Sequence, residues 1–205
     1  MPSATAVSFA IALSGLMMTT ALAQDASPRD DAATEVVPVV PVSPQRTRQQ
    51  ELDKLFGELH QAPVNLNTTE LEKKIWASWQ RNDSVMAEVL LNQASVALND
   101  RAYDVSEQIL NQVLGAYPDY MEAFNRRATL YFALKRYDES LVDIDQVLEF
   151  EPRHFGALAG RGMILREQGK LSAAAQALRE ALSINPHMQS AKEVLKELEK
   201  QAPDI

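Results

Sequence analysis

A pattern that repeats every 34 residues most constrains what this chain can fold into. Pro118, Pro152 and Pro186 fall at this interval, and each comes just before a new helical run. A self-similarity of this period predicts helical hairpins that stack side by side, because one hairpin cannot bury its apolar face alone. Aligning the units on their prolines also brings other positions into register. These are Leu90, Phe124 and Leu158 at position four, Ala94, Ala128 and Gly162 at position eight, and Leu110, Ile144 and Leu178 at position twenty-four.

Each unit is expected to form a first helix, a tight turn and a second helix packed antiparallel to it. The small residues at position eight predict a close approach of the two helices, since a larger side chain would overpack the contact. The residues at position twenty are expected to face them from the second helix, and those at position twenty-seven to pack against the next unit. The two sets are Ser106, Ser140 and Ala174, and Val113, Val147 and Ala181.

With leucine or phenylalanine at position four, small residues at eight and proline at thirty-two, the units resemble the tetratricopeptide repeat (TPR) family. The resemblance implies an all-α fold, a right-handed α-solenoid of helix-turn-helix units at 87–120, 121–154 and 155–188. It departs from the family at position seven, where Gln93, Arg127 and Arg161 replace the usual leucine. Such an array is expected to hold other protein chains and to have no catalytic residues.

Residues 48–86 predict a degenerate helical hairpin before the first unit. Each of its two helices carries an apolar stripe: Leu52, Leu55, Phe56 and Leu59 in the first, and Leu71, Ile75, Trp76 and Trp79 in the second. We expect the two tryptophans to pack between this hairpin and the first repeat, which makes the hairpin an end cap for the first repeat's open face. At the other end, residues 189–200 predict a capping helix with the stripe Ala191, Val194, Leu195 and Leu198, followed by a tail at 201–205.

The amino terminus predicts export. Residues 1–23 contain no charged side chain and end in Ala21-Leu22-Ala23, which is typical of a signal peptide cleaved after Ala23. This places the mature protein in a bacterial periplasm. The alternative is an uncleaved membrane anchor, because Ala4 to Ala23 approaches the roughly 20 residues that a bilayer requires. Residues 24–47, with four prolines and no aromatic residue, predict a disordered Pro/Val-rich linker.

Composition excludes several classes of partner and site. The formal net charge of −8 argues against nucleic acid and against a surface held to anionic lipid by charge. The absence of cysteine excludes disulfides and thiolate metal sites. His60, His154 and His187 are isolated in the sequence, so we expect no metal and no cofactor. A metal-dependent enzyme built on the acidic second helix of unit two is the alternative left open.

The family resemblance also implies a concave groove lined by first helices. Hydrogen-bonding groups on the first helix of unit two are expected to hold a peptide backbone, and apolar residues are expected to supply pockets. The predicted groove residues are Glu88, Leu91, Ser95, Leu98, Glu122, Asn125, Arg126, Thr129, Phe132, Met163 and Arg166. A clamp for the carboxylate end of heat-shock chaperones, which some family members carry, is not expected. Leu91, Ser95 and Gly156 stand where that clamp needs lysine, asparagine and lysine.

These observations together predict a non-catalytic scaffold or adaptor of the bacterial cell envelope that binds a partner peptide or helix. The alternatives are a membrane-tethered spacer with its leader retained and, less favoured, a cryptic enzyme.

Overall fold

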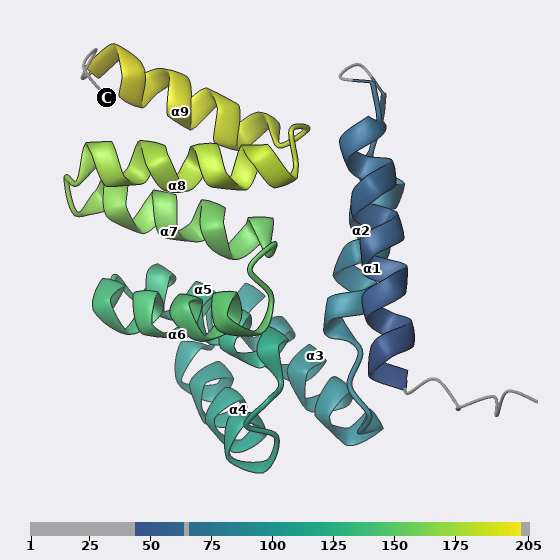
Figure 1. Cartoon of the computed structure of the whole chain (residues 1–205). Coiled ribbons are helices and arrows are strands. Elements are labelled where there is room, and N and C mark those ends of the chain that lie inside the picture. The colour runs from purple at the N-terminus through teal and green to yellow at the C-terminus, as the bar shows by residue number, and fades with distance from the viewer. Residues whose placement is uncertain (1–43, 64–65, 202–205) are drawn as a thin grey trace, which may run out of the picture. The chain divides into compact units, whose positions relative to one another are not determined.

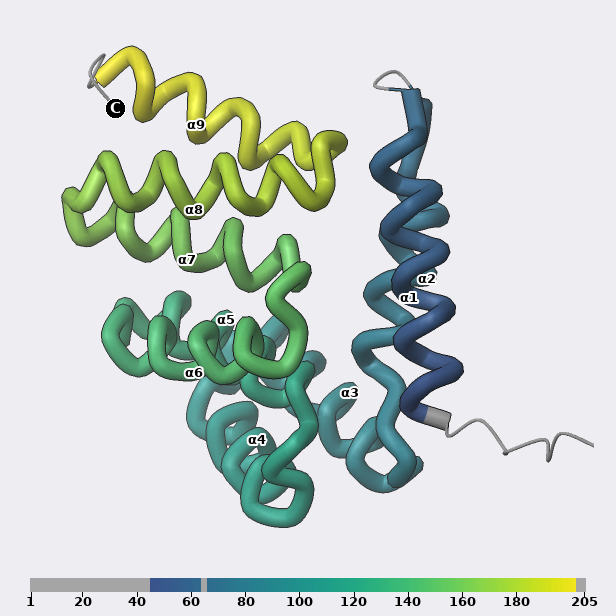
Figure 2. Tube along the Cα trace, in the orientation of Figure 1, coloured from purple at the N-terminus to yellow at the C-terminus, as the bar shows by residue number. Residues whose placement is uncertain are grey.

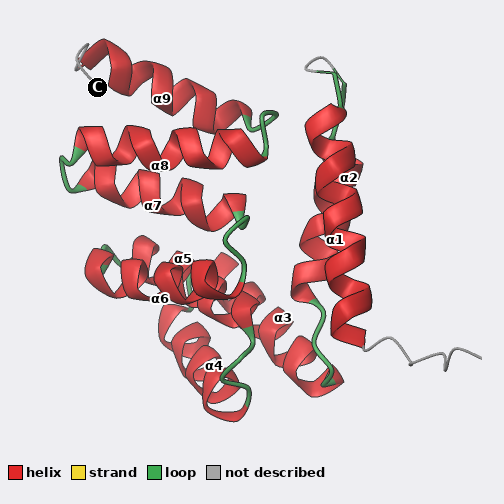
Figure 3. Ribbon diagram, viewed as in Figure 1, coloured by secondary structure: helices red, strands yellow, loops and turns green. Residues whose placement is uncertain are grey.

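A computed structural model describes residues 44–63 and 66–201, and all of the regular secondary structure in these two ranges is helical (Figure 3). The predicted signal peptide, residues 24–43 of the predicted linker and residues 202–205 of the tail lie outside them. The helices are α1 (Pro44–Gln61), α2 (Thr69–Gln80), α3 (Val85–Asn99), α4 (Tyr103–Ala116), α5 (Met121–Ala133), α6 (Tyr137–Phe150), α7 (Phe155–Glu167), α8 (Leu171–Ile184) and α9 (Gln189–Gln201).

The three predicted repeats are the hairpins α3–α4, α5–α6 and α7–α8 (Figures 1 and 2). Between hairpins, α4 packs on α5, α6 on α7, and α8 on the carboxy-terminal helix α9. Each hairpin turns through a residue in the left-handed region at the same repeat position, with φ of 60° at Arg101, 58° at Lys135 and 73° at Gly169. The all-α solenoid and its 34-residue period are therefore confirmed.

The two helices of each unit lie in close contact at position eight, as the small residues there predict. The buried hydroxyl of Ser106 donates to the carbonyl of Ala94 at 2.9 Å, and that of Ser140 donates to the carbonyl of Ala128 at 2.7 Å. In unit three Gly162 takes this place, and a Cβ built there would lie 2.7 Å from Leu178 Cγ. In unit three the second helix therefore lies so close to the first that a side chain at position eight would collide with it.

We expect Gly162→Ala to lower the free energy of unfolding by about 1–3 kcal/mol, because the new methyl group overpacks a buried contact. Gly160→Ala, two residues earlier in the same helix, is the matched control. Its Cβ would meet Ile144 Cδ1 at 3.6 Å, an ordinary contact, so alanine should stabilise the helix by about 0.5–1 kcal/mol. Urea unfolding followed by circular dichroism measures both, and equal effects would contradict the close approach.

The amino-terminal hairpin differs from the prediction in its start and in its position. Helix α1 begins at Pro44, so the predicted linker boundary after residue 47 falls inside a helix; proline suits a first helical turn, where its missing N–H has no partner to lose. More importantly, the hairpin does not cap the first repeat. It lies against the second and third repeats, where α2 contacts α5, and Ile75 and Trp79 pack in one apolar cluster with Phe155 of α7.

The third repeat offers the two tryptophans a surface that suits their shape. Trp79 stacks on His154 with ring centroids 4.0 Å apart, and Trp76 meets Phe155 edge to face at 5.7 Å. Gly156 leaves room for Trp76, since a Cβ there would lie 2.6 Å from its ring. The expected packing of both tryptophans against the first repeat is therefore wrong, because their aromatic partners begin α7.

The carboxy-terminal cap is confirmed as a helix, and Ala191 and Leu198 are its buried residues. None of the helices in the described part of the chain has both the length and the apolar character needed to cross a bilayer.

Candidate peptide-binding groove

A hollow of about 160 Å³ lies mainly between α5 and α7, the first helices of units two and three. Thr129 and Phe132 line it from α5, and Gly160 and Met163 line it from α7. Its other lining residues are Asn125, Ala128, Ser140, Ile144, Gly156, Ala157 and Ile164. The structure thus brings four predicted groove residues together here, namely Asn125, Thr129, Phe132 and Met163.

Two polar residues of the hollow, Asn125 and Thr129, lie on α5, and a third, Ser140, lies on α6. The amide of Asn125 donates to Glu122 Oε2 at 2.8 Å, and the exposed Thr129 hydroxyl donates to the Asn125 carbonyl at 2.9 Å. The Thr129 oxygen can still accept a hydrogen bond from a peptide N–H. An apolar hollow with a few placed polar groups is suited to hold one apolar side chain of a peptide and fix its backbone.

Helix α2 covers the positions next to the hollow. Glu122 is completely buried there, with its two carboxylate oxygens 3.6 Å from Arg126 Nη2 and 3.6 Å from His154 Nε2. Lys73, Trp76 and Arg126 line one pocket between the hairpin and α5. Glu122 and Arg126, predicted to line an open groove, therefore lie in the contact between the hairpin and the repeats, because α2 occupies that face.

His154 lies between Glu122 of α5 and the first turn of α7. Its Nδ1 accepts a hydrogen bond from the Ala157 backbone N–H at 3.0 Å, so the neutral ring carries its proton on Nε2, which faces Glu122. A second histidine acts similarly farther along, where His187 Nε2 lies 3.2 Å from the Leu59 carbonyl of α1. Both histidines, which are isolated in the sequence, contact the hairpin: His154 stacks on Trp79, and His187 lies against the Leu59 carbonyl.

The other predicted groove residues are not part of the hollow. Leu91 is only 3% exposed and belongs to the core around α3 and α4, and Leu98 packs against the same core. Glu88 accepts from the Asn82 N–H at 2.8 Å. Ser95 donates to the Leu91 carbonyl, and Arg166 pairs with Glu167. Family spacing alone placed these five residues on an open face, whereas packing within the first repeat and local pairing take up their side chains.

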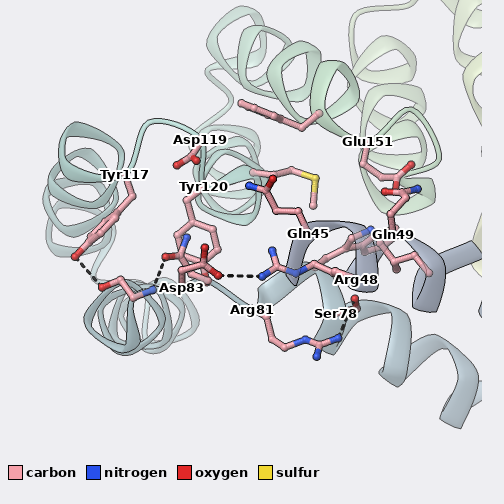
Figure 4. Close-up of a pocket in the computed structure, with 16 residues that line it drawn as sticks. Gln45, Arg48, Gln49, Ser78, Arg81, Asp83, Tyr117, Asp119, Tyr120 and Glu151 are labelled. Carbon is pink, nitrogen blue, oxygen red and sulfur yellow. Dashed lines mark hydrogen bonds and ion pairs between the residues drawn. The ribbon is translucent and has the colours of Figure 1, made fainter. Parts of the chain in front are cut away.

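Sequence reasoning missed a larger cleft of about 670 Å³, beside the start of α1 and the loops that follow α2 and α4 (Figure 4). Its charged and polar groups pair with one another: Arg48 lies 3.4 Å from Asp83, and Ser84 donates to the Tyr117 hydroxyl at 2.9 Å. Tyr120 donates to the Gln80 carbonyl, and burial, with the nearby charges of Glu88 and Glu122, raises the pKa of its hydroxyl. No motif marks the cleft, because these partners lie far apart in the chain and outside the repeat register.

The acidic side chains of α6 pair with arginines and glutamines. Asp143 accepts two hydrogen bonds from Arg127 at 2.8 Å, and Glu139 and Asp145 pair with Arg136 and Arg161. Over residues 44–63 and 66–201, no group of three histidines and acids is placed to hold a metal ion. Asp138 and Glu149 of the same helix accept hydrogen bonds from Gln168 and Gln146.

Fold and groove together define an α-solenoid repeat protein, and comparison with known proteins identifies the family. The tetratricopeptide repeat family model matches residues 91–150 and 143–188. A TPR repeat-containing protein of Rhizobium etli is 33% identical over 145 residues, which are 71% of each chain. The chain belongs to the tetratricopeptide repeat family.

Solved TPR domains share the fold. The first TPR domain of Spaghetti (RPAP3), bound to an HSP90 peptide, has a TM-score of 0.56 at 21% identity and covers 60% of this chain and 97% of its own. The TPR2B domain of yeast Sti1, in a complex with pHsp70, has a TM-score of 0.53 at 14% identity over 58% of this chain and 99% of its own.

Proposed function

We propose that this protein is a non-catalytic adaptor of the bacterial cell envelope that binds a segment of a partner protein in the hollow between α5 and α7. The observation that carries the proposal is the convergence of Thr129, Phe132 and Met163 on one apolar hollow at inner-face positions of two successive repeats. The peptide complexes of structurally similar TPR domains support a peptide as the kind of ligand.

The ligand we propose differs from an acidic chaperone tail. Those tails are held by a lysine-rich carboxylate clamp in some members of the family. Here Leu91 is buried in the core and Gly156 lies against Trp76. The hollow is instead lined mainly by apolar residues, among them Phe132, Met163 and Ile164, with Asn125, Thr129 and Ser140 as its polar residues. We therefore propose an extended segment that inserts one apolar side chain between α5 and α7.

A paired substitution tests this site. Thr129→Glu with Met163→Glu places two carboxylates in the hollow, and we expect at least a tenfold loss of partner recovery in affinity capture from envelope extracts of the native host, followed by mass spectrometry. The matched control is Val142→Glu, at an exposed valine on α6 that lies outside the hollow. Recovery of the same partner by all three proteins would contradict the assignment, provided that circular dichroism shows equal helicity.

The envelope location rests on the charge-free leader that ends in Ala21-Leu22-Ala23. Sequencing of the mature amino terminus tests it. A start at Gln24 supports a released periplasmic protein, and a start at Met1 supports the alternative of a membrane-tethered spacer.

A further inference from the structure

Helix α7 contains three glycines, Gly156, Gly160 and Gly162, although glycine destabilises a helix relative to alanine. Two of them have a packing reason, because a Cβ at Gly156 would collide with the Trp76 ring and a Cβ at Gly162 would collide with α8. At Gly160, the one heavy atom of the described residues that a Cβ would meet within 4 Å is Ile144 Cδ1, at an ordinary 3.6 Å. The packing of the chain itself therefore does not require a glycine at this position.

The other two units carry polar or charged side chains at the positions of these glycines. Gly156 and Gly160 stand at positions two and six of unit three, one helical turn apart on the same face of α7. The corresponding pairs are Glu88 and Asn92 in unit one and Glu122 and Arg126 in unit two. Trp76 fills the space beside Gly156, whereas the space beside Gly160 stays open as part of the hollow between α5 and α7.

We infer that Gly160 is the specificity-determining residue of the groove and that it makes room for one phenylalanine side chain of the partner segment, a role that rests on the proposed peptide-binding function. A glycine lets a ligand approach the helix closely because it has no Cβ. The hollow has a volume of about 160 Å³. An apolar cavity of about 150 Å³ holds one benzene ring, so the hollow has the size of a phenyl group.

The walls of the hollow suit an aromatic ring. Met163 of α7 supplies a thioether, which makes favourable contacts with the edge of an aromatic ring. Phe132 of α5 supplies a second ring, and two aromatic rings attract each other edge to face. Ile144 and Ile164, both almost completely buried, add apolar surface. A phenylalanine therefore gains contacts here that an aliphatic side chain lacks.

This role separates binding from stability at one residue. A Cβ at Gly160 would point toward Ile144, which also lines the hollow, so a side chain at this position enters the space that we assign to the ligand. Gly160→Ala should stabilise α7 and yet weaken the binding of a phenylalanine-containing peptide by about tenfold or more. Gly160→Leu should fill the hollow and abolish binding. A glycine with a purely structural role would not combine higher stability with weaker binding.

Gly57→Ala is the matched control. Gly57 lies inside α1, outside the hollow, and a Cβ there would meet nothing within 4 Å. Alanine should therefore stabilise this helix as well, but it should leave the affinity for the peptide unchanged. Urea unfolding followed by circular dichroism compares the stability of the three variants with that of the wild type.

Peptide selection on the full chain provides the probe for the binding measurement. A random-peptide phage library is panned on the wild-type protein, an enriched peptide is synthesised, and its affinity is measured by isothermal titration calorimetry. We expect the enriched peptides to share one phenylalanine. Replacing it by alanine, which leaves the hollow empty, or by tryptophan, whose ring system is larger than the hollow, should lower the affinity by about tenfold or more.

Two results would overturn the inference about Gly160: enriched peptides that share no phenylalanine, or an affinity that is unchanged in Gly160→Leu. The groove variant Thr129→Glu, Met163→Glu tests the proposed function separately. If the peptide binds this variant as it binds the wild type, the groove assignment is wrong. If the groove variant loses binding and Gly160→Leu keeps it, the groove remains and the role of Gly160 is refuted.

Discussion

Trp79→Ala will lower the free energy of unfolding by about 3–5 kcal/mol, the largest loss that we expect from a single side chain. Trp79 is 5% exposed; it contacts Phe56 within the hairpin and joins the hairpin to the repeats through His154 and Phe155 at the start of α7. Removing the indole leaves a cavity at the centre of this aromatic cluster. Urea unfolding followed by circular dichroism measures the loss.

The same variant reports on the hairpin directly. The chain has two tryptophans, so Trp76 is the single emitter left in Trp79→Ala, and its emission should shift to the red as the hairpin loosens. Phe150→Ala is the matched control, because this aromatic residue is 49% exposed and should cost no more than about 1 kcal/mol. Similar small losses for both variants would contradict the docking of the hairpin.

Arg127→Met will lower the free energy of unfolding by about 3 kcal/mol, because it leaves the Asp143 carboxylate buried without its counter-charge. Arg127 Nε and Nη2 donate to the two oxygens of Asp143 at 2.8 Å, and Asp143 is 2% exposed. These hydrogen bonds raise the pKa of Arg127 above its ordinary value. Thermal or urea unfolding of the variant provides the measurement.

Arg161 supplies the control at the same repeat position. It pairs with Asp145, but the side chains are 28% and 67% exposed, so Arg161→Met should cost less than about 1 kcal/mol. Adding Asp143→Leu to Arg127→Met should restore most of the lost stability, since it removes the uncompensated charge. If Arg127→Met and Arg161→Met cost the same, burial of the Arg127–Asp143 pair is not what stabilises unit two.

The repeats could be predicted because their information is local and periodic. Pro118, Pro152 and Pro186 set the interval, and small residues at position eight report a contact within one hairpin. Ser106 and Ser140 add a hydrogen bond to that contact, again between residues only twelve apart. Each of these signals is visible without knowing how distant parts of the chain meet.

The hairpin's position could not be predicted, because it depends on single residues far apart in the sequence. Trp76 packs on Gly156, and Arg153 reaches Asp53 at a distance of 2.8 Å, although the two residues are 100 positions apart. The family pattern marks Gly156 only as a place where a clamp lysine is absent. Nothing in a 34-residue pattern indicates that the same glycine makes room for an indole ring.

The residues of the candidate groove could be predicted only in part, because the position of the hairpin decides which of them are covered. Family spacing identified Thr129, Phe132 and Met163, which lie where α2 does not reach. It also selected Glu122, and Arg126 was added to the groove as a hydrogen-bonding group, but both lie beside the hairpin. Because the spacing describes an array with an uncovered inner face, it cannot show which part an additional hairpin covers.

The docking of the hairpin on the second and third repeats is the central structural claim, and a cross-link within one chain tests it most directly. The protein contains no cysteine, so Asp53→Cys with Arg153→Cys introduces a single thiol pair at the ends of an exposed ion pair. A short bifunctional thiol reagent should join the two thiols in a product that has the mass of one chain and migrates faster on a denaturing gel. A hairpin that capped the first repeat would leave the two introduced thiols unjoined, and that result would contradict the structure described here.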